Sequence, residues 1–242
     1  MYEIVTTYYD DTENRVQNLN KFIDHYKEFN AKIHLISNKE IELPNNFVLH
    51  VIDEGFYNRT ALLNKAYSYV NEKIVCSIDI DIIINETDLE KSVNECIKHK
   101  FVIPFNKVFN KDDNGLQEIN MFHASYATVK VGTEHTNPWP FNYDITYPSF
   151  VGFIFVFDKD EYEKLGFENK NIIGWGFDDL ERYSRISKFY KIHFSNNSII
   201  HNNHPYVNSK AFDFIENNIK EWYKVESLSK EELLSYIRIN LL

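Results

Sequence analysis

The sequence predicts a single α/β domain with a mostly parallel central sheet, helices on both faces of that sheet and a helical C-terminal tail. Three observations lead to this fold class. Short apolar runs rich in β-branched residues alternate with segments whose apolar residues recur at helical spacing. The most apolar run, residues 73–84, has the composition of a strand buried on both faces. The chain has 242 residues, 43% of them hydrophobic, which suffices for one domain with a full core.

Strand and helix patterns alternate through the first half of the chain. The predicted strands cover residues 3–7, 32–36, 47–52, 73–78 and 101–104. The predicted helices cover residues 16–29, 57–70 and 87–97. Thr87 and Glu90 have the spacing of a capping box, so we expect the third helix to begin at Thr87. This alternation is what predicts a parallel sheet covered by helices.

The second half of the chain begins with a segment that has no clear elements. Residues 106–149 are polar without a sustained period, which predicts a lid, a binding loop or a partly disordered segment. The strands predicted after it cover residues 150–157, 191–194 and 198–200. The helices predicted after it cover residues 158–165 and 178–190 and the amphipathic tail 210–242. We expect no domain boundary, because no repeat or low-complexity linker interrupts the chain.

Charge and composition narrow the range of partners. The net charge is −10, which argues against a nucleic-acid backbone or an anionic membrane as a bulk partner. A phosphorylated ligand would therefore need a cation or local basic residues. Cys76 and Cys96 fall on apolar faces and are expected to be reduced core thiols. No signal peptide or transmembrane run is visible, so we expect a cytoplasmic protein, with peripheral membrane contact left open.

Asp79 and Asp81 interrupt the most apolar run. Two like charges on one face of a core strand are costly to bury without partners, so we expect the strand to end near Ile78. Both acids would then lie at the carboxyl edge of the sheet, where open α/β sheets bind ligands. A divalent cation between the acids and the phosphates of a ligand would compensate the charge. An ordinary strand end is the alternative interpretation.

Residues 174–179 read Gly-Trp-Gly-Phe-Asp-Asp and precede a predicted helix. Two glycines around a tryptophan indicate a turn in which the backbone can approach a ligand closely. Asp178 and Asp179 fall in the first helical turn, where free N–H groups and the helix dipole favour ionised carboxylates. A carboxylate beside an exposed aromatic ring suits a sugar and can accept a proton from its hydroxyl. Taken alone, such residues more often form an ordinary helix start with a core tryptophan.

His201 and His204 follow the last predicted strand, in what we expect to be a loop, because Pro205 follows them directly. Two histidines this close can chelate one metal ion. The chain contains nine histidines, however, so an incidental pair is the alternative. Together with Asp81, imidazole ligands suit Mn²⁺ better than Mg²⁺, which prefers all-oxygen shells.

The ordered set of motifs resembles nucleotide-sugar glycosyltransferases of the GT-A fold. Within that fold it is most similar to the inverting β-1,4-galactosyltransferase-like group and the related bacterial chondroitin-polymerase-type domains. The matching segments are residues 14–15 (Asn-Arg opening a helix), 57–64 (that group's Phe-Asn-Arg-x-x-Leu-Leu-Asn), 77–81 (its Asp-x-Asp strand end), 174–179 (its Gly-Trp-Gly-Gly-Glu-Asp) and 201–204 (its Met-x-x-His). The order agrees over roughly residues 1–205.

The resemblance implies a role for each matched residue. The implied metal ligands, for Mn²⁺ or alternatively Mg²⁺, are Asp81, His201 and His204. The implied nucleotide-binding residues are Thr6, Arg15, Tyr57, Arg59, Asp79 and Ile80. The implied sugar-binding residues are Trp175, Gly176 and Asp178, and the implied general base is Asp179. The nucleotide-binding half would span about 1–105, the acceptor and metal half about 106–205, and the helical tail about 206–242.

The implied reaction is metal-dependent inverting transfer of a hexose or N-acetylhexosamine from a UDP-sugar to a hydroxyl of a glycan, lipid-linked glycan or protein. The metal would neutralise the pyrophosphate leaving group. Phe177 and Asp178 replace the group's glycine and glutamate, so the acceptor pocket is expected to be reshaped. His201 replaces its methionine, which is expected to alter metal preference. We expect this protein to lack the Golgi stem, membrane anchor and disulfides of the animal enzymes, and therefore to use a different acceptor.

Two other functions remain open from the sequence. A retaining family of protein GalNAc-transferases has a similar Trp-Gly-acidic motif, but usually carries Asp-x-His where this chain has Asp-x-Asp. The other is a catalytically inactive carbohydrate-binding subunit of the same fold. An inactive subunit would have lost its base or its metal ligands, and the joint presence of Asp79, Asp81, Asp179 and His204 argues against this. A hydrolase with paired carboxylates is least supported, since nothing in it requires the histidine pair.

Overall fold

The computed structural model describes residues 1–9, 13–52, 55–112, 115–119, 126–131, 143–148, 151–202 and 213–242. Its centre is a sheet of seven strands: β1 (Glu3–Tyr8), β2 (Lys32–Ser37), β3 (Phe47–Val51), β4 (Ile74–Ile78), β6 (Phe101–Ile103), β11 (Ile154–Asp158) and β12 (His193–Phe194). Their order is β12-β6-β11-β4-β1-β2-β3. Only β11 runs antiparallel to its neighbours in this sheet, so the predicted mostly parallel arrangement is confirmed.

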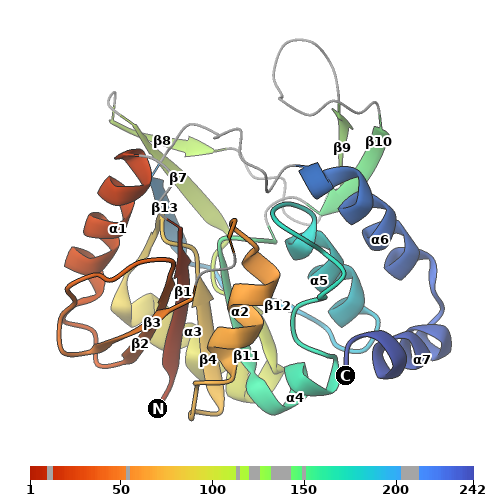
Figure 1. Cartoon of the computed structure of the whole chain (residues 1–242), viewed down its shortest axis with the longest axis horizontal. Helices are drawn as coiled ribbons and strands as arrows, with labels where there is room; N and C mark the ends of the chain where they lie inside the picture. Colours follow the sequence, from red (N-terminus) through yellow and green to blue (C-terminus); the bar gives the residue numbers. More distant parts are fainter. Residues whose placement is uncertain are drawn as a thin grey trace.

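Helices cover both faces of the sheet and extend to one side of it (Figure 1). They are α1 (Glu13–Tyr26), α2 (Arg59–Tyr67), α3 (Glu86–His99), α4 (Lys159–Lys164), α5 (Asp178–Ser187), α6 (Ile215–Ser227) and α7 (Lys230–Asn240). In Figure 1, α2 lies in front of the sheet and α3 behind it, while the C-terminal helices α6 and α7 lie beside α5. The predicted helical tail is therefore confirmed. No helix in the described ranges is long and apolar enough to cross a membrane.

The core lies between the central sheet and its helices. Strands β1, β4 and β11 are buried along their whole length, as their apolar runs predict. Cys76 and Cys96 are both buried and unpaired, in agreement with the expected reduced core thiols. The N-cap of helix α3 lies two residues before the predicted one: it is Asn85, whose side-chain oxygen accepts from the backbone N–H of Thr87. The predicted Thr87 capping box is therefore wrong.

The segment 106–149 contains strands, which contradicts the expectation of a region without elements. These are β7 (Lys107–Asp112), β8 (Gly115–Ile119), β9 (Tyr126–Val131) and β10 (Tyr143–Pro148). β9 and β10 form an antiparallel pair. β7 and β8 join β5 (Ile82–Ile84) and β13 (Ser198–Asn202) in a second sheet of order β5-β13-β7-β8.

The second sheet also changes the placement of His201. His201 lies within β13, where it is opposite Ile82 of β5 and Asn110 of β7. The expected loop at this position is therefore wrong, because pairing with a strand on each side extends β13 to Asn202. β11, in turn, begins at Ile154, four residues later than predicted from the apolar run.

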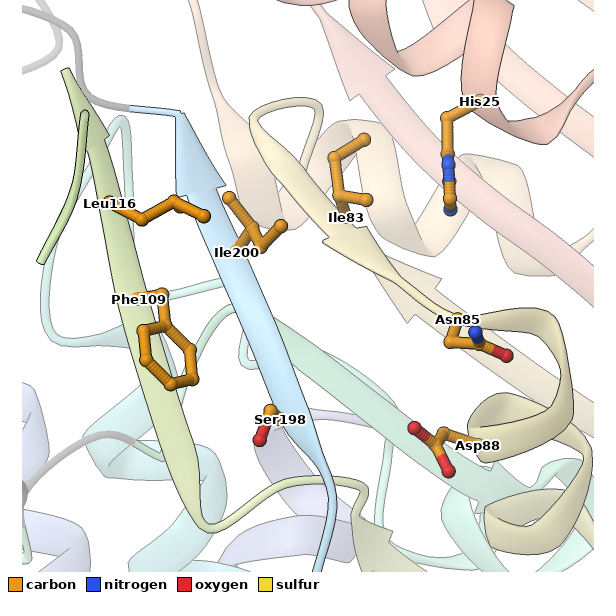
Figure 2. A pocket seen from close by; sticks show the side chains of 8 residues that line it. All are labelled: His25, Ile83, Asn85, Asp88, Phe109, Leu116, Ser198 and Ile200. Carbon is orange, nitrogen blue, oxygen red and sulfur yellow. The ribbon is translucent and has the colours of Figure 1, made fainter. Parts of the chain in front are cut away.

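One face of the second sheet carries an open cavity of about 440 Å³. Figure 2 shows its lining: Ile83, Phe109, Leu116 and Ile200 from the four strands, with His25, Asn85, Asp88 and Ser198 around them. Side chains alternate along a strand, so the residues next to Phe109 and Ile200 face the opposite side. Asn110 and His201 are these neighbours, so both face away from the cavity.

Candidate active site

Three carboxylates from two distant segments meet at one guanidinium group. Asp79 follows the end of β4, as predicted, and Asp178 and Asp179 begin α5. Arg59, the first residue of α2, is 5% exposed, and its Nη2 lies 2.8 Å from Asp79 Oδ1. Its Nη1 contacts the carboxylate of Asp178 and lies 3.3 Å from Asp179 Oδ1. The fold thus brings the Asp-x-Asp turn and the 174–179 motif together.

Arg182 is a second cation in this cluster. It lies one helical turn beyond Asp179, contacts the Asp179 carboxylate, and places Nη1 3.0 Å from Glu168 Oε1. Burial alone raises the pKa of Asp179, but Arg59 and Arg182 outweigh burial and hold that pKa below its usual range. Asp179 is therefore ionised, and its side chain is still 31% exposed. Sequence analysis did not single out Arg182, although an arginine three residues after a helical acid is a recognisable ion-pair signal.

The pKa values of Asp178 and Asp79 are shifted in the opposite direction to that of Asp179. Burial raises the pKa of Asp178 to about 6, with Asp179 adding to the shift and Arg59 opposing it. Burial likewise raises the pKa of Asp79, and the negative charges of Asp179 and Asp81 add to the effect while Arg59 opposes it. Neighbouring carboxyls whose pKa values are pushed apart are suited to different roles in proton transfer.

The turn that leads into α5 depends on glycine. Gly174 has φ 72° and Gly176 has φ 96°, both in the left-handed region that side chains disfavour. Phe177, which stands where the resembling group has glycine, also has φ 70°. Its ring packs 5.7 Å from that of Trp222 on α6, which helps to hold this residue in place. Gly152 lies against the same motif, and a Cβ at that position would collide with the Asp179 carboxylate.

Two asparagines to which the sequence motifs assigned no role hold this turn by hydrogen bonds. Asn58 precedes Arg59 and accepts a hydrogen bond from the backbone N–H of Gly174 at 3.2 Å. Asn218 on α6 is fully buried and donates to the carbonyl oxygens of Ile173 at 2.8 Å and Gly176 at 3.1 Å. Its Oδ1 accepts from the N–H of Ile173 at 2.9 Å. An asparagine on the apolar face of an amphipathic helix is the signal that could have identified Asn218.

Asn169 connects α5 with α6 through hydrogen bonds to a glutamate on each helix. Asn169 donates to Glu181 Oε1 on α5 and to Glu221 Oε1 on α6, at 3.1 Å in both cases. Glu181 in turn pairs with Arg185 Nε at 2.8 Å. Helices α5 and α6 are therefore linked through Asn169 by one buried and one partly buried hydrogen bond.

Replacing Asn218 with alanine is expected to lower the free energy of unfolding by about 1–3 kcal/mol, because buried polar groups lose their partners. Urea unfolding measures this change. Asn217→Ala is the matched control, since Asn217 is exposed on the same helix and is expected to shift stability by about 0.5 kcal/mol or less. Equal stability of the two variants would show that Asn218 does not support the turn.

Aromatic and cationic groups gather beside the end of β1. The Tyr57 hydroxyl lies 3.1 Å from Thr7 Oγ1, and the Arg15 guanidinium lies 5.9 Å from the Tyr57 ring centroid. Such a surface can stack a base and attract an anion. Thr6 and Ile80, which the resemblance assigns to the nucleotide, are 0% and 2% exposed. Thr7 rather than Thr6 contacts Tyr57, because alternate residues of β1 face opposite sides.

Asp81 and His201 are the metal-ligand candidates that the structure describes. Asp81 Oδ2 lies 3.8 Å from His201 Nε2, and His201 Nδ1 lies 2.6 Å from Asn110 Oδ1. A carboxylate and an imidazole with its other nitrogen hydrogen-bonded are suitable donors for a divalent ion. His204 lies outside the described residues, and the described ranges contain no group of three or more metal-ligating side chains. Asp81 and His201 therefore fit a metal as a partial ligand set.

Trp175 and Gly176 occupy the middle of the glycine turn. Trp175 is partly exposed and Gly176 is buried. The carbonyl oxygens of both residues accept from Asn218, at 3.4 and 3.1 Å. The structure thus fixes the backbone of the implied sugar-binding segment directly before Asp178.

Comparison with known proteins supports the fold. A family model described as the N-terminal domain of galactosyltransferase matches residues 135–206, and no curated protein matches. The structure of GalNAc-T7 with UDP, GalNAc and Mn²⁺ aligns at a TM-score of 0.67 and 11% identity, covering 98% of this chain and 49% of that one. Staphylococcus aureus TarS 1–349 with UDP-GlcNAc aligns at 0.57 and 10% identity, covering 99% of this chain and 67% of that one.

These likenesses show that the chain has the GT-A glycosyltransferase fold, as the sequence predicts. The chain spans about half the length of the GalNAc-T7 structure that it matches. The catalytic domain of Drosophila β1,4-galactosyltransferase 7 aligns at a TM-score of 0.47 and 12% identity, covering 95% of this chain and 82% of that one, and adds no weight.

Proposed function

We propose that this protein is a metal-dependent inverting glycosyltransferase that moves a hexose or N-acetylhexosamine from a UDP-sugar to a hydroxyl of a glycan, lipid-linked glycan or protein. One observation carries the proposal: Asp79 meets Asp178 and Asp179 around Arg59 at the carboxyl edge of the sheet. The GT-A fold supports it, since the GalNAc-T7 and TarS structures contain UDP or a UDP-sugar.

Different residues of the chain would bind the nucleotide, bind the sugars and transfer the proton. Arg15 and Tyr57 would hold the nucleotide, and Trp175 would pack against the sugars. Asp178 would accept a hydrogen bond from the acceptor, and Asp179 would take the proton from the attacking hydroxyl. Asp81, His201 and His204 would hold Mn²⁺, or Mg²⁺ as the alternative. When bound, this ion supplies positive charge that stabilises the departing diphosphate.

Arg59 links donor binding to the strength of the base. Its guanidinium pairs with Asp79, Asp178 and Asp179, and the resemblance assigns it to the nucleotide. A diphosphate that draws Arg59 away from Asp179 would raise the pKa of that carboxyl, because one of its two cations is removed. The base would thus become stronger once the donor is in place.

The direct test is to incubate the protein with a panel of nucleotide sugars and Mn²⁺ and to measure release of the nucleoside diphosphate. We expect release of UDP from a UDP-hexose or UDP-N-acetylhexosamine, and less release with EDTA. If no nucleotide sugar in the panel is bound or cleaved with Mn²⁺ or Mg²⁺, the proposed function is wrong.

A retaining transfer is the second candidate. The pairing of Asp179 with Arg59 and Arg182 favours it, because a carboxylate with a lowered pKa is a weaker base and a retaining reaction does not rely on one. Proton NMR of the first-formed product separates the two, since the anomeric configuration of the sugar is inverted or kept.

The raised pKa of Asp178 predicts a pH dependence. In the folded protein this carboxyl keeps its proton up to about pH 6, well above its ordinary 3.8. Its contribution to stability is therefore full below the ordinary pKa and is lost as the pH rises through about 6. If the ionised form binds the acceptor, kcat/KM for the acceptor should rise through the same range. Asp178→Asn should lack this rise, and a variant that keeps it would show that another group titrates.

A further inference from the structure

The second sheet places Asn110 beside a proposed metal ligand. β7 and β13 run parallel, and Asn110 is directly opposite His201. Figure 2 shows their chain neighbours Phe109 and Ile200 on the cavity side of the sheet. By alternation, Asn110 and His201 face the other side, where Asp81 lies. Two positions that are 91 residues apart in sequence are thus held in contact by strand pairing.

In the hydrogen bond between these two side chains, His201 is the donor and Asn110 is the acceptor. His201 Nδ1 lies 2.6 Å from Asn110 Oδ1, and a carboxamide oxygen can only accept a hydrogen bond. Nδ1 must therefore carry the ring proton. In a neutral imidazole this leaves Nε2 with its lone pair, and Nε2 is the nitrogen that faces Asp81 Oδ2 at 3.8 Å.

We propose that Asn110 is a positioning residue for the metal site: its carboxamide oxygen holds His201 in the Nδ1–H tautomer and thereby makes Nε2 the metal-binding nitrogen. This inference rests on the proposed function, in which Asp81 and His201 bind the ion. Removing such an outer hydrogen-bond partner typically weakens metal binding by roughly 10–100-fold. The resembling group has methionine where this chain has His201, and methionine has no tautomers. A residue that fixes the tautomer is therefore needed only because this chain has histidine.

The test uses the full chain with UDP and follows free Mn²⁺ by electron paramagnetic resonance during titration. Asn110→Ala is expected to weaken Mn²⁺ binding by roughly 10–100-fold. Asn110→Asp should restore it, because a carboxylate also accepts from Nδ1–H. Gln117→Ala is the matched control, since Gln117 is paired with Asn110 across the ladder, is exposed, and should leave affinity unchanged.

A second measurement reports the tautomer without any metal. The nitrogen-15 shifts of the His201 ring should show the proton on Nδ1 in the parent protein and in Asn110→Asp, and a mixture of tautomers in Asn110→Ala. A general packing defect would not produce this pattern of loss and rescue.

The outcomes separate this inference from the proposed function. Parental Mn²⁺ affinity in Asn110→Ala, together with its loss in Asp81→Ala, would overturn the role of Asn110 and leave the metal site standing. Equal losses in Asn110→Ala and Asn110→Asp would also overturn it, because the acceptor oxygen would not matter. If the parent protein binds no Mn²⁺ with UDP, the metal site fails, and the role of Asn110 fails with it.

Discussion

Asp179→Asn is expected to lower turnover by a factor on the order of 10² or more while donor and metal binding remain intact. The amide cannot take the proton from the acceptor hydroxyl. The side chain keeps an oxygen for Arg182, which also stays paired with Glu168, so we expect α5 to keep its place. The rate of UDP release at saturating donor and acceptor measures the loss of turnover, and calorimetry with UDP measures donor binding.

Asp160→Asn provides the control for this variant. Asp160 is an exposed acid on α4, 3.6 Å from Lys73 and outside the carboxylate cluster, so its substitution should leave turnover unchanged. Parental turnover in Asp179→Asn would mean that the proton is accepted elsewhere. Combined with a product of retained configuration, that result would favour the retaining reaction.

Asp81→Ala is expected to abolish Mn²⁺-dependent binding of UDP. Asp81 supplies a carboxylate 3.8 Å from His201 Nε2, and imidazoles without a carboxylate hold Mn²⁺ weakly. The backbone carbonyl of Asp81, which accepts from Asn202 at 2.8 Å, is retained in the variant, so β13 should keep its position. Calorimetric titration of UDP with Mn²⁺ and with EDTA measures the effect.

Asp88→Ala is the matched control for the metal experiment. Asp88 lines the cavity on the opposite face of the second sheet, and its carboxylate pairs with Lys91 at 2.8 Å (Figure 2). Its loss should not affect UDP binding. Equal UDP affinity with Mn²⁺ and with EDTA in the parent protein would contradict the metal assignment, whatever the variants do.

The sequence was sufficient to predict the central sheet. β1, β4 and β11 are buried throughout, so their apolar runs identify them without knowledge of their neighbours. The second sheet could not be predicted in the same way. β5 has three residues, and β13 is partly exposed and pairs on its two sides with β5 and β7, which both lie much earlier in the chain. Apolar periodicity carries no information about which distant strands pair.

The site was likewise predicted only in part, because sequence motifs do not show which distant side chains pair. Asp79, Asp178 and Asp179 were identified from motifs, and the structure brings them together around Arg59. The pairing of Arg59 with Asp178 could not be predicted, because the two residues are 119 positions apart in the sequence. Asn218 escaped notice because its partners are backbone atoms, which no side-chain motif records.

The hydrogen bonds of Asn218 have a practical consequence for the choice of recombinant fragments. A shortened protein that stops at residue 206, where the family match ends, would contain every residue assigned here to substrate or metal. It would nevertheless lack the side-chain amide of Asn218, which donates hydrogen bonds to the carbonyl oxygens of Ile173 and Gly176. Fragments intended for crystallisation or screening should therefore extend through α6 and α7.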